Sequence, residues 1–426
     1  MPTLLGVVGL LIGLIVVFAI AGRHRAIAAP LLIGFALRAI LALIDSEVFK
    51  LPGQDDSYSF DFRAYYISQK GFLGTFEHLS TGVALYTWFI SAMYAIFERS
   101  RLMMQSINVL FGSLIIFNAW RLTRVISDDA RRSLIAAWMV ALFPSLIFFS
   151  CVMLREVAVA YPLSLGVYYF DSWQRHKKQH HLVAGVAGLL VSMAFHSGGF
   201  AVLLGAGVWL FGQTLRALFR GQVVQFVRSS LALSVAIGAV AFAVSSGFGM
   251  EKFHAVESGE LSELKAQQGN FARGRTVYLA DLSAETPADL LWQAPLRLTY
   301  FLFAPFPWML EEATDLVGLV DSCFFLFLCA RVWRARRVLT EYPRAVVVLG
   351  VFAAMAFTFA LGVSNYGTAQ RHRNKMLPLL IAGSMSLPGR KRREIANSAA
   401  VALGLRAKSS APAPAIGVVQ ARSHRL

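Results

Sequence analysis

Four basic side chains stand within five residues near the C-terminal end of the chain. The stretch SNYGTAQRHRNKMLPLL carries Arg371, His372, Arg373 and Lys375 directly before an apolar run. Charges beside hydrocarbon are costly unless a partner compensates them. Because arginine binds phosphate oxygens through paired hydrogen bonds, the cluster predicts a site for phosphate or diphosphate. The alternative is that these residues anchor a cytoplasmic helix end.

Two other segments carry carboxylates suited to acid–base chemistry or metal binding. Asp55 and Asp56 lie in GQDDSYSFDFRAYY (53–66), and Glu156 follows Arg155 after the apolar stretch FPSLIFFSCVML. A carboxylate can accept a proton from a hydroxyl or bind Mg²⁺ or Mn²⁺, and either aspartate is a candidate for both roles. The alternatives are solvated loop acids for the aspartates, and an ion pair that ends a helix for Arg155 and Glu156.

His196 lies in FHSGG, between two short apolar runs. The two glycines after it allow a close approach of the backbone. This histidine is therefore a further candidate for neutralising phosphate, although a histidine at a helix end is more often packed or solvated.

Other kinds of site lack their motifs. The chain contains no GxxxxGK[ST] phosphate loop, no HExxH zinc motif and no Ser-His-Asp pattern, which argues against a nucleotide-driven mechanism or a hydrolase. Its three cysteines, Cys151, Cys323 and Cys329, have no metal-ligand spacing. We interpret them as packing residues.

The composition is that of a membrane protein. Hydrophobic residues make up 57% of the 426 residues and charged residues 15%, with a mean hydropathy of +0.58, which lies outside the usual range for soluble domains. The formal charge of +16 comes mostly from short clusters between apolar runs. Cytoplasmic loops account for such clusters, so we expect no nucleic-acid partner.

The apolar runs predict an all-α, polytopic fold. Two short runs, 82–97 and 299–310, are expected to be partial or interfacial helices, because several basic loops would lie outside if every run crossed the membrane. We expect about eleven full spans, at 2–22, 29–45, 105–120, 133–151, 157–170, 182–195, 200–214, 230–248, 313–333, 345–363 and 376–388.

The basic loops predict the orientation. If the two short segments return to the side that they entered from, every strongly basic loop becomes cytoplasmic. The N-terminus is then outside and the C-terminus cytoplasmic, although ERSR (98–101) is left on the outer side. A transmembrane domain is expected over 1–390, with outer loops at 46–104 and 249–312. The remainder, 391–426, reads as a disordered basic cytoplasmic tail.

The order of these segments resembles a known class of enzyme. The acidic first loop ending in AYY, then SINVLFGSLIIFNAWRLTR (106–124) and ALFPSLIFFSCVMLREV (141–157), is similar to polytopic bacterial glycosyltransferases of the GT-C type. FHSGG and GTAQRHRNKMLPLL are also similar to segments of EpsG-like and Wzy-like surface-polysaccharide polymerases. The chain departs from the GT-C pattern in having two spans, rather than one, before the acidic loop.

The resemblance implies transfer of a sugar from a polyprenyl-phosphate or diphosphate donor to an acceptor glycan. The reaction would take place at the outer face of a bacterial inner membrane, in surface or exopolysaccharide biosynthesis beside membrane lipid and polysaccharide-export proteins. Asp55 or Asp56 would be the catalytic base or a metal ligand, with Glu156 as a second acid. The donor phosphate would be bound by Arg155, His196, Arg371, His372 and Arg373.

Two other functions stay open at this point. A transporter or flippase of an anionic lipid-linked metabolite would need ionisable residues near mid-membrane, and only Arg38 and Asp321 meet that condition. A non-catalytic subunit of an envelope polysaccharide assembly machine would tolerate alanine at all the outer charged positions.

Overall fold

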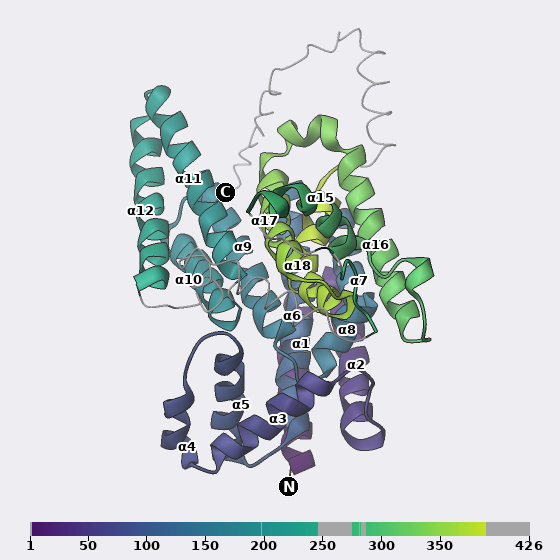
Figure 1. Ribbon diagram of the computed structural model, residues 1–426. Helices are drawn as coiled ribbons and strands as arrows, with labels where there is room; N and C mark the ends of the chain where they lie inside the picture. Colours follow the sequence, from purple (N-terminus) through teal and green to yellow (C-terminus); the bar gives the residue numbers. More distant parts are fainter. Residues whose placement is uncertain (1, 197, 246–274, 281, 283–286, 389–426) are drawn as a thin grey trace, which may run out of the picture. The chain divides into compact units, whose positions relative to one another are not determined.

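The computed structural model describes residues 2–196, 198–245, 275–280, 282 and 287–388. All regular elements in this part of the chain are helices, apart from one isolated β-bridge between Val277 and Asn365. The all-α prediction is confirmed (Figure 1). The predicted tail at 391–426, residues 249–274, 281 and 283–286 of the predicted second outer loop, and the end of the predicted span at 230–248 lie outside the described residues.

Sixteen α-helices follow one another along the described chain and form one compact unit that ends at Leu387. They are α1 (Pro2–Arg23), α2 (Ala28–Leu43), α3 (Asp55–Ser68), α4 (Gly71–Gly74), α5 (Val83–Phe97), α6 (Arg101–Ser127), α7 (Ala130–Leu142), α8 (Pro144–Cys151), α9 (Glu156–His176), α10 (Gln179–Phe195), α11 (Gly199–Phe219), α12 (Val223–Ser245), α15 (Pro287–Phe303), α16 (Asp315–Arg334), α17 (Pro343–Gly362) and α18 (Tyr366–Ser386).

Six described helices are long and apolar enough to cross a membrane, and a seventh span results if α7 and α8 are counted as one bent helix. The six are α1, α2 with the turn that follows it, α6, α12, α16 and α17. The protein is therefore a membrane protein. Four further predicted spans coincide with α9, α10, α11 and α18; α10 is shorter, with 17 residues, and α9 and α18 are more polar. The total of eleven stays a prediction.

Helix α6 lies at the centre of this arrangement and contacts α1, α2, α7, α8, α9 and α18. Its close contact with α1 depends on small residues. A Cβ atom added at Gly6 would lie 2.4 Å from the Leu102 side chain. Ser100, which caps α6, donates a 2.5 Å hydrogen bond to the carbonyl of Pro2, so α1 and α6 begin at the same end of the unit.

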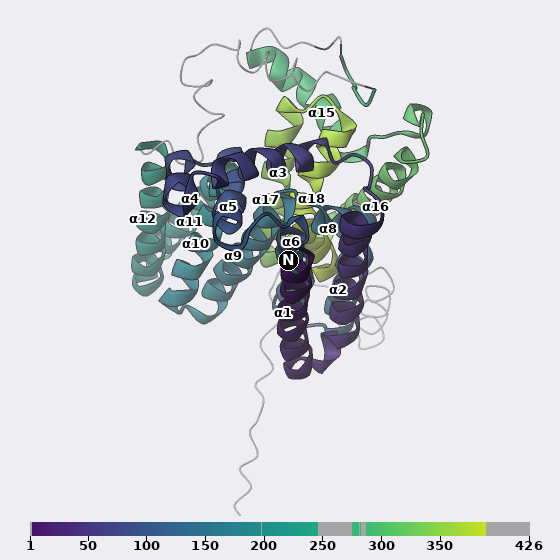
Figure 2. The same ribbon diagram turned by 90° about the horizontal axis from the view of Figure 1, so that it is seen from below.

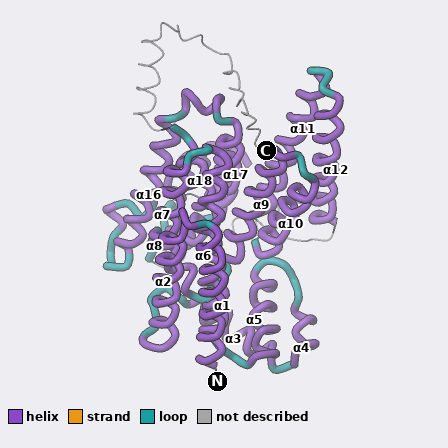
Figure 3. Tube along the Cα trace, turned by 180° about the vertical axis from the view of Figure 1, so that it is seen from behind, coloured by secondary structure: helices purple, strands orange, loops and turns teal. Residues whose placement is uncertain are grey.

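The end where α1 and α6 begin also carries α3, α4 and α5 (Figures 1, 2 and 3). Helix α5 has 15 residues, which gives a length of about 22 Å, less than the ~30 Å hydrocarbon core. It packs along α3, and the backbone N–H of Gly82 before it donates a 2.7 Å bond to the carbonyl of Ala194 at the end of α10. A partial helix at 82–97 agrees with these dimensions.

A buried arginine stabilises the break between α7 and α8, which are bent by 55°. Pro144 has no N–H to bond the carbonyl of Val140, so the bend frees carbonyl groups inside the apolar region. The guanidinium of Arg38 donates to the carbonyls of Val140 and Ala141, each at 3.0 Å. Arg38 is fully buried, and its charge therefore has a structural explanation.

Arg373 has the same role at the end of α15. Helix α15 ends before Pro305, which leaves nearby carbonyl groups without helical partners. The guanidinium of Arg373 donates to the carbonyls of Leu302 at 2.7 Å and Ala304 at 2.8 Å, and it also bonds the hydroxyl of Ser322. Arg373 is fully buried among these groups.

Candidate functional site

Charged residues from three helices meet at the end of the unit where α3 lies. We call Asp56, Glu156, Arg371, His372 and Lys375 the outer charge cluster, after the side of the membrane on which the sequence predicts it. Asp56 is in the first turn of α3, Glu156 begins α9, and the three basic residues lie in the first three turns of α18. Arg371 and Lys375 are four residues apart, so they share one face of α18.

Arg371 joins the two carboxylates of this cluster. Its Nε donates to Glu156 Oε1 at 3.0 Å, and its Nη1 donates to Asp56 Oδ2. Lys375 Nζ lies 3.8 Å from Glu156 Oε1. Two carboxylates thus face two cations, and the cluster is close to neutral in its formal charges.

The two carboxylates differ in burial. The side chain of Glu156 is 2% exposed, whereas that of Asp56 is 58% exposed. Glu156 Oε2 makes no hydrogen bond within the described residues. An exposed ion pair contributes at most about 1 kcal/mol, so the bond from Arg371 to Asp56 is the easier of the two to exchange for another anion.

Two histidines lie against the same cluster. His372 Nδ1 is 2.8 Å from Lys375 Nζ, and the His372 ring stacks on Phe359 with centroids 4.5 Å apart. The ring of His196 approaches His372 edge-on, with 5.1 Å between centroids. A Cβ atom at Gly198 would lie 2.4 Å from the Phe359 ring, which explains why a glycine follows at that position.

Not every residue predicted for the site lies in the cluster. Arg373 faces the end of α15, where its donors are bound to backbone carbonyls. Arg155 donates to the carbonyl of Phe195 at 3.1 Å, at the end of α10. Asp55 is exposed and has no ion pair within the described residues. The cluster therefore brings together Asp56, Glu156, Arg371 and His372, with His196 beside it.

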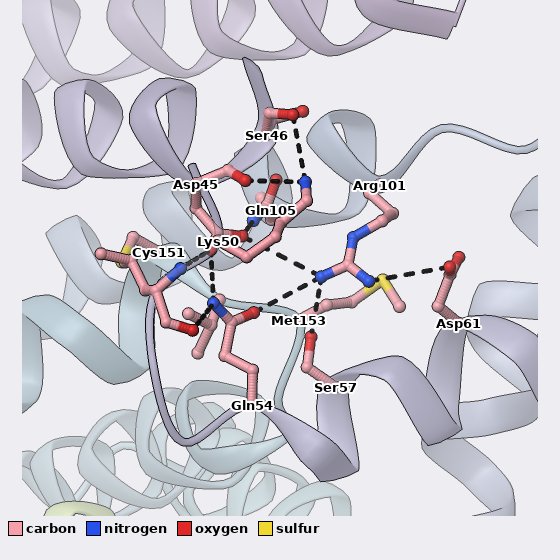
Figure 4. Close-up of polar contacts among 12 residues, drawn as sticks. Asp45, Ser46, Lys50, Gln54, Ser57, Asp61, Arg101, Gln105, Cys151 and Met153 are labelled. Atoms are coloured by element: carbon pink, nitrogen blue, oxygen red, sulfur yellow. Dashed lines mark hydrogen bonds and ion pairs between the residues drawn. The ribbon is translucent and has the colours of Figure 1, made fainter. Parts of the chain in front are cut away.

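A second polar cluster joins the end of α2 to α3 and α6 (Figure 4). Asp45 is fully buried and accepts a 2.6 Å hydrogen bond from Gln105 and another from Gln54. Arg101 lies 4.0 Å from Asp45 and 3.7 Å from Asp61. Sequence reasoning missed this cluster, because Asp45 and Gln105 appear there as ordinary ends of apolar runs.

The two arginines of ERSR (98–101) lie in the same region. Arg99 forms an ion pair with Asp61 at 2.5 Å, and this hydrogen-bonded carboxylate raises the pKa of the Arg99 guanidinium. Arg101 stacks over Tyr58, 4.5 Å from the ring centroid. Both arginines therefore have an acidic partner in Asp61.

A third contact ties part of the second outer loop to α16 and α18. Arg275 donates to Asp315 at 2.6 and 3.1 Å and to the hydroxyl of Tyr366 at 3.2 Å. The hydrogen-bonded carboxylate of Asp315 raises the pKa of Arg275. The backbone N–H of Tyr278 also donates to the carbonyl of Ser364. This loop segment therefore lies over the start of α18.

Few candidate metal ligands lie together within the described residues. No group of three His, Cys, Asp or Glu side chains gathers as metal ligands in this part of the chain. Asp56 and Glu156 already share the cation Arg371, and a second cation beside it would be repelled. We therefore derive no step that uses a metal ion.

Comparison with known proteins adds no family assignment. No family model matches the chain, and no curated protein matches it.

Proposed function

We propose that the protein is a multi-pass glycosyltransferase or polysaccharide polymerase of the inner membrane, with a GT-C-like fold of about eleven spans. Its donor is a polyprenyl-phosphate or diphosphate sugar, and its acceptor is a growing surface glycan at the outer face. The observation that carries the proposal is the outer charge cluster. A buried acid, an exposed acid and several basic groups lie at one end of a bundle of apolar helices.

The cluster suits a lipid-linked phosphate for two reasons. Arg371 and Lys375 supply two donors side by side on one face of α18. Glu156 is buried beside both and keeps them in place, so they are preorganised for an anion.

In the proposed reaction the donor phosphate displaces Asp56 from Arg371. The freed Asp56 carboxylate then accepts the proton of the acceptor hydroxyl, whose oxygen forms a bond to the anomeric carbon of the sugar. The bond between that carbon and the phosphate oxygen breaks, and its electron pair leaves with the lipid phosphate. Arg371 and Lys375 stabilise the negative charge on this leaving group, so charge balance does not require Mg²⁺ or Mn²⁺.

A transporter would use the mid-membrane charges Arg38 and Asp321, and one of them has a structural explanation. Arg38 is bound to the carbonyls of a broken helix, and Asp321 accepts a 2.9 Å hydrogen bond from Gln370. The place of Arg38 is therefore explained without a transported ion, whereas Asp321 Oδ1 has no hydrogen-bond partner within the described residues. A non-catalytic assembly subunit is distinguished from an enzyme by the following experiment.

The test is a transfer assay with purified full-length protein and a radiolabelled polyprenyl-diphosphate sugar, with and without EDTA. We expect product from the wild type under both conditions and none from Arg371→Ala. Lys70→Ala is the matched control, because Lys70 is a cation of the same region whose ion pair is with Glu77. Donor binding without product in the wild type would support an assembly subunit or transporter, and loss of product with EDTA would show that a metal is needed.

A further inference from the structure

A lateral groove of about 900 Å³ runs between α9, α11 and α17. It is separate from the outer charge cluster. Its apolar part is lined by residues such as Val167, Val202, Val208, Val347 and Val351. Val208 is 72% exposed, which shows that this lining is open to the surroundings of the helices.

One end of the groove is polar. It is lined there by Gln174, Gln213, Arg216 and the ion pair between Asp171 and Arg344. Arg344 also donates to the carbonyl of Val125 at 2.8 Å. Because Arg344 neutralises Asp171, the exposed guanidinium of Arg216 supplies the excess positive charge. The groove therefore has the polarity of an amphiphile with a negative headgroup.

The length of the groove corresponds to one leaflet of a bilayer. Val202 and Arg216 line it on the same helix, fourteen residues and thus about 21 Å apart. Half of a ~30 Å hydrocarbon core, with a headgroup region beyond it, has a similar depth. A transmembrane helix of another protein would need a surface along both leaflets, whereas one lipid needs only this length.

Glycines leave room for a hydrocarbon chain. Gly205, Gly212 and Gly350 line the groove, and a Cβ atom added at any of them would meet no atom within 4 Å. Larger side chains could therefore be placed there without steric conflict in the protein. With glycine at these three positions, the space beside the helices stays open for a bound molecule.

We propose that this groove binds an anionic glycerophospholipid, in the leaflet at the end of the bundle opposite the outer charge cluster. The phosphate lies near Arg216 and Gln213, and one acyl chain lies along the glycines. A basic pocket between helices at this depth is the usual setting for anionic headgroups. This lipid site is independent of the proposed sugar transfer.

The test is native mass spectrometry of the full-length protein with phosphatidylglycerol, phosphatidylcholine or a polyprenyl phosphate added in turn. Since one arginine near the membrane surface contributes about 1 kcal/mol, we expect roughly fivefold preference for phosphatidylglycerol over phosphatidylcholine. Arg216→Gln should remove this preference. The double variant Gly212→Leu with Gly350→Leu should lose most of the bound lipid.

Gly207→Leu is the matched control, because Gly207 lies on the same helix, has equal free space around it and does not line the groove. It should bind lipid like the wild type, and a thermal unfolding scan of each variant checks that it is folded. Unchanged binding in the double glycine variant, or equal binding of both phospholipids by the wild type, would overturn the proposal. Binding of polyprenyl phosphate alone, or a dimer that the leucines abolish, would assign the groove to another occupant.

Discussion

Arg371 is the residue on which the chemistry of the outer charge cluster depends. It contacts a carboxylate of α3 and a carboxylate of α9, two elements about a hundred residues apart in the chain. One of these contacts is exposed and one is buried. The exposed contact can be exchanged for a substrate phosphate while the buried one keeps the guanidinium oriented.

We expect Arg371→Lys to weaken donor binding without abolishing transfer. Lysine keeps the positive charge but loses the fork that bonds two oxygens in parallel, and about 1.4 kcal/mol of lost interaction corresponds to a tenfold rise in the KM for donor. Transfer rates over a range of donor concentrations measure this change. Equal KM values for Arg371→Lys and the wild type would show that the fork does not contact donor.

At the residue scale, sequence predicted which segments meet but not which side chains pair. Polar residues at the ends of apolar runs are expected at the surface of the membrane. This expectation placed Glu156, His196 and Arg371 at the same surface. Two residues along a helix turn by about 200°, so Arg373 points away from Arg371 and toward α15. The four-residue spacing of Arg371 and Lys375 indicates that they share one face of a helix. It does not indicate which residues of other helices they contact.

At the scale of elements, broken helices are held by buried arginines. We expect Arg38→Leu to lower the free energy of unfolding by about 2–4 kcal/mol, because it leaves two buried carbonyls without donors. Pro144→Ala restores the N–H that can bond Val140, so the double variant should recover part of the loss. Unfolding of the wild type, both single variants and the double variant in detergent, followed by circular dichroism, measures these free energies. If the effects of Arg38→Leu and Pro144→Ala simply add, the two residues are not coupled and the explanation is wrong.

Arg373→Met should also act on the fold rather than on the donor. Its guanidinium bonds the carbonyls at the end of α15, and we expect a loss of about 2–4 kcal/mol of stability with donor affinity of the folded protein unchanged. Thermal unfolding and donor binding by the same sample separate the two effects. A large loss of affinity with normal stability would return Arg373 to the phosphate site.

The helices were predictable from apolar runs, whereas their polar extensions were not. Helix α18 begins at Tyr366, ten residues before the predicted span at 376–388, because Arg371, Arg373 and Lys375 find partners on other elements. Helix α3 was read as part of a polar loop, since its contacts with α5 and α6 become visible only in three dimensions. The break within 133–151 follows from Pro144, which the sequence does contain.

At the scale of the whole molecule, orientation is the open prediction that a labelling experiment decides. We expect Asp55→Cys, on exposed α3, to react with an impermeant thiol reagent in cells with a permeabilised outer membrane. Arg337→Cys, between α16 and α17, should react only after lysis. Both variants are made in a protein from which the three native cysteines have been removed. Labelling of Arg337→Cys in cells, with Asp55→Cys labelled only after lysis, would contradict an outer location of the charge cluster.

The most direct test of the account measures donor affinity and turnover separately for Asp56→Asn, with Asp55→Asn as the neighbouring control. Because Asp56 competes with phosphate for Arg371, Asp56→Asn should bind donor up to about fivefold more tightly. It should also transfer sugar at least ~100-fold more slowly, since the base is lost. Asp55→Asn should match the wild type in both. Weaker binding together with normal turnover in Asp56→Asn would contradict the proposed exchange of Asp56 for the donor phosphate.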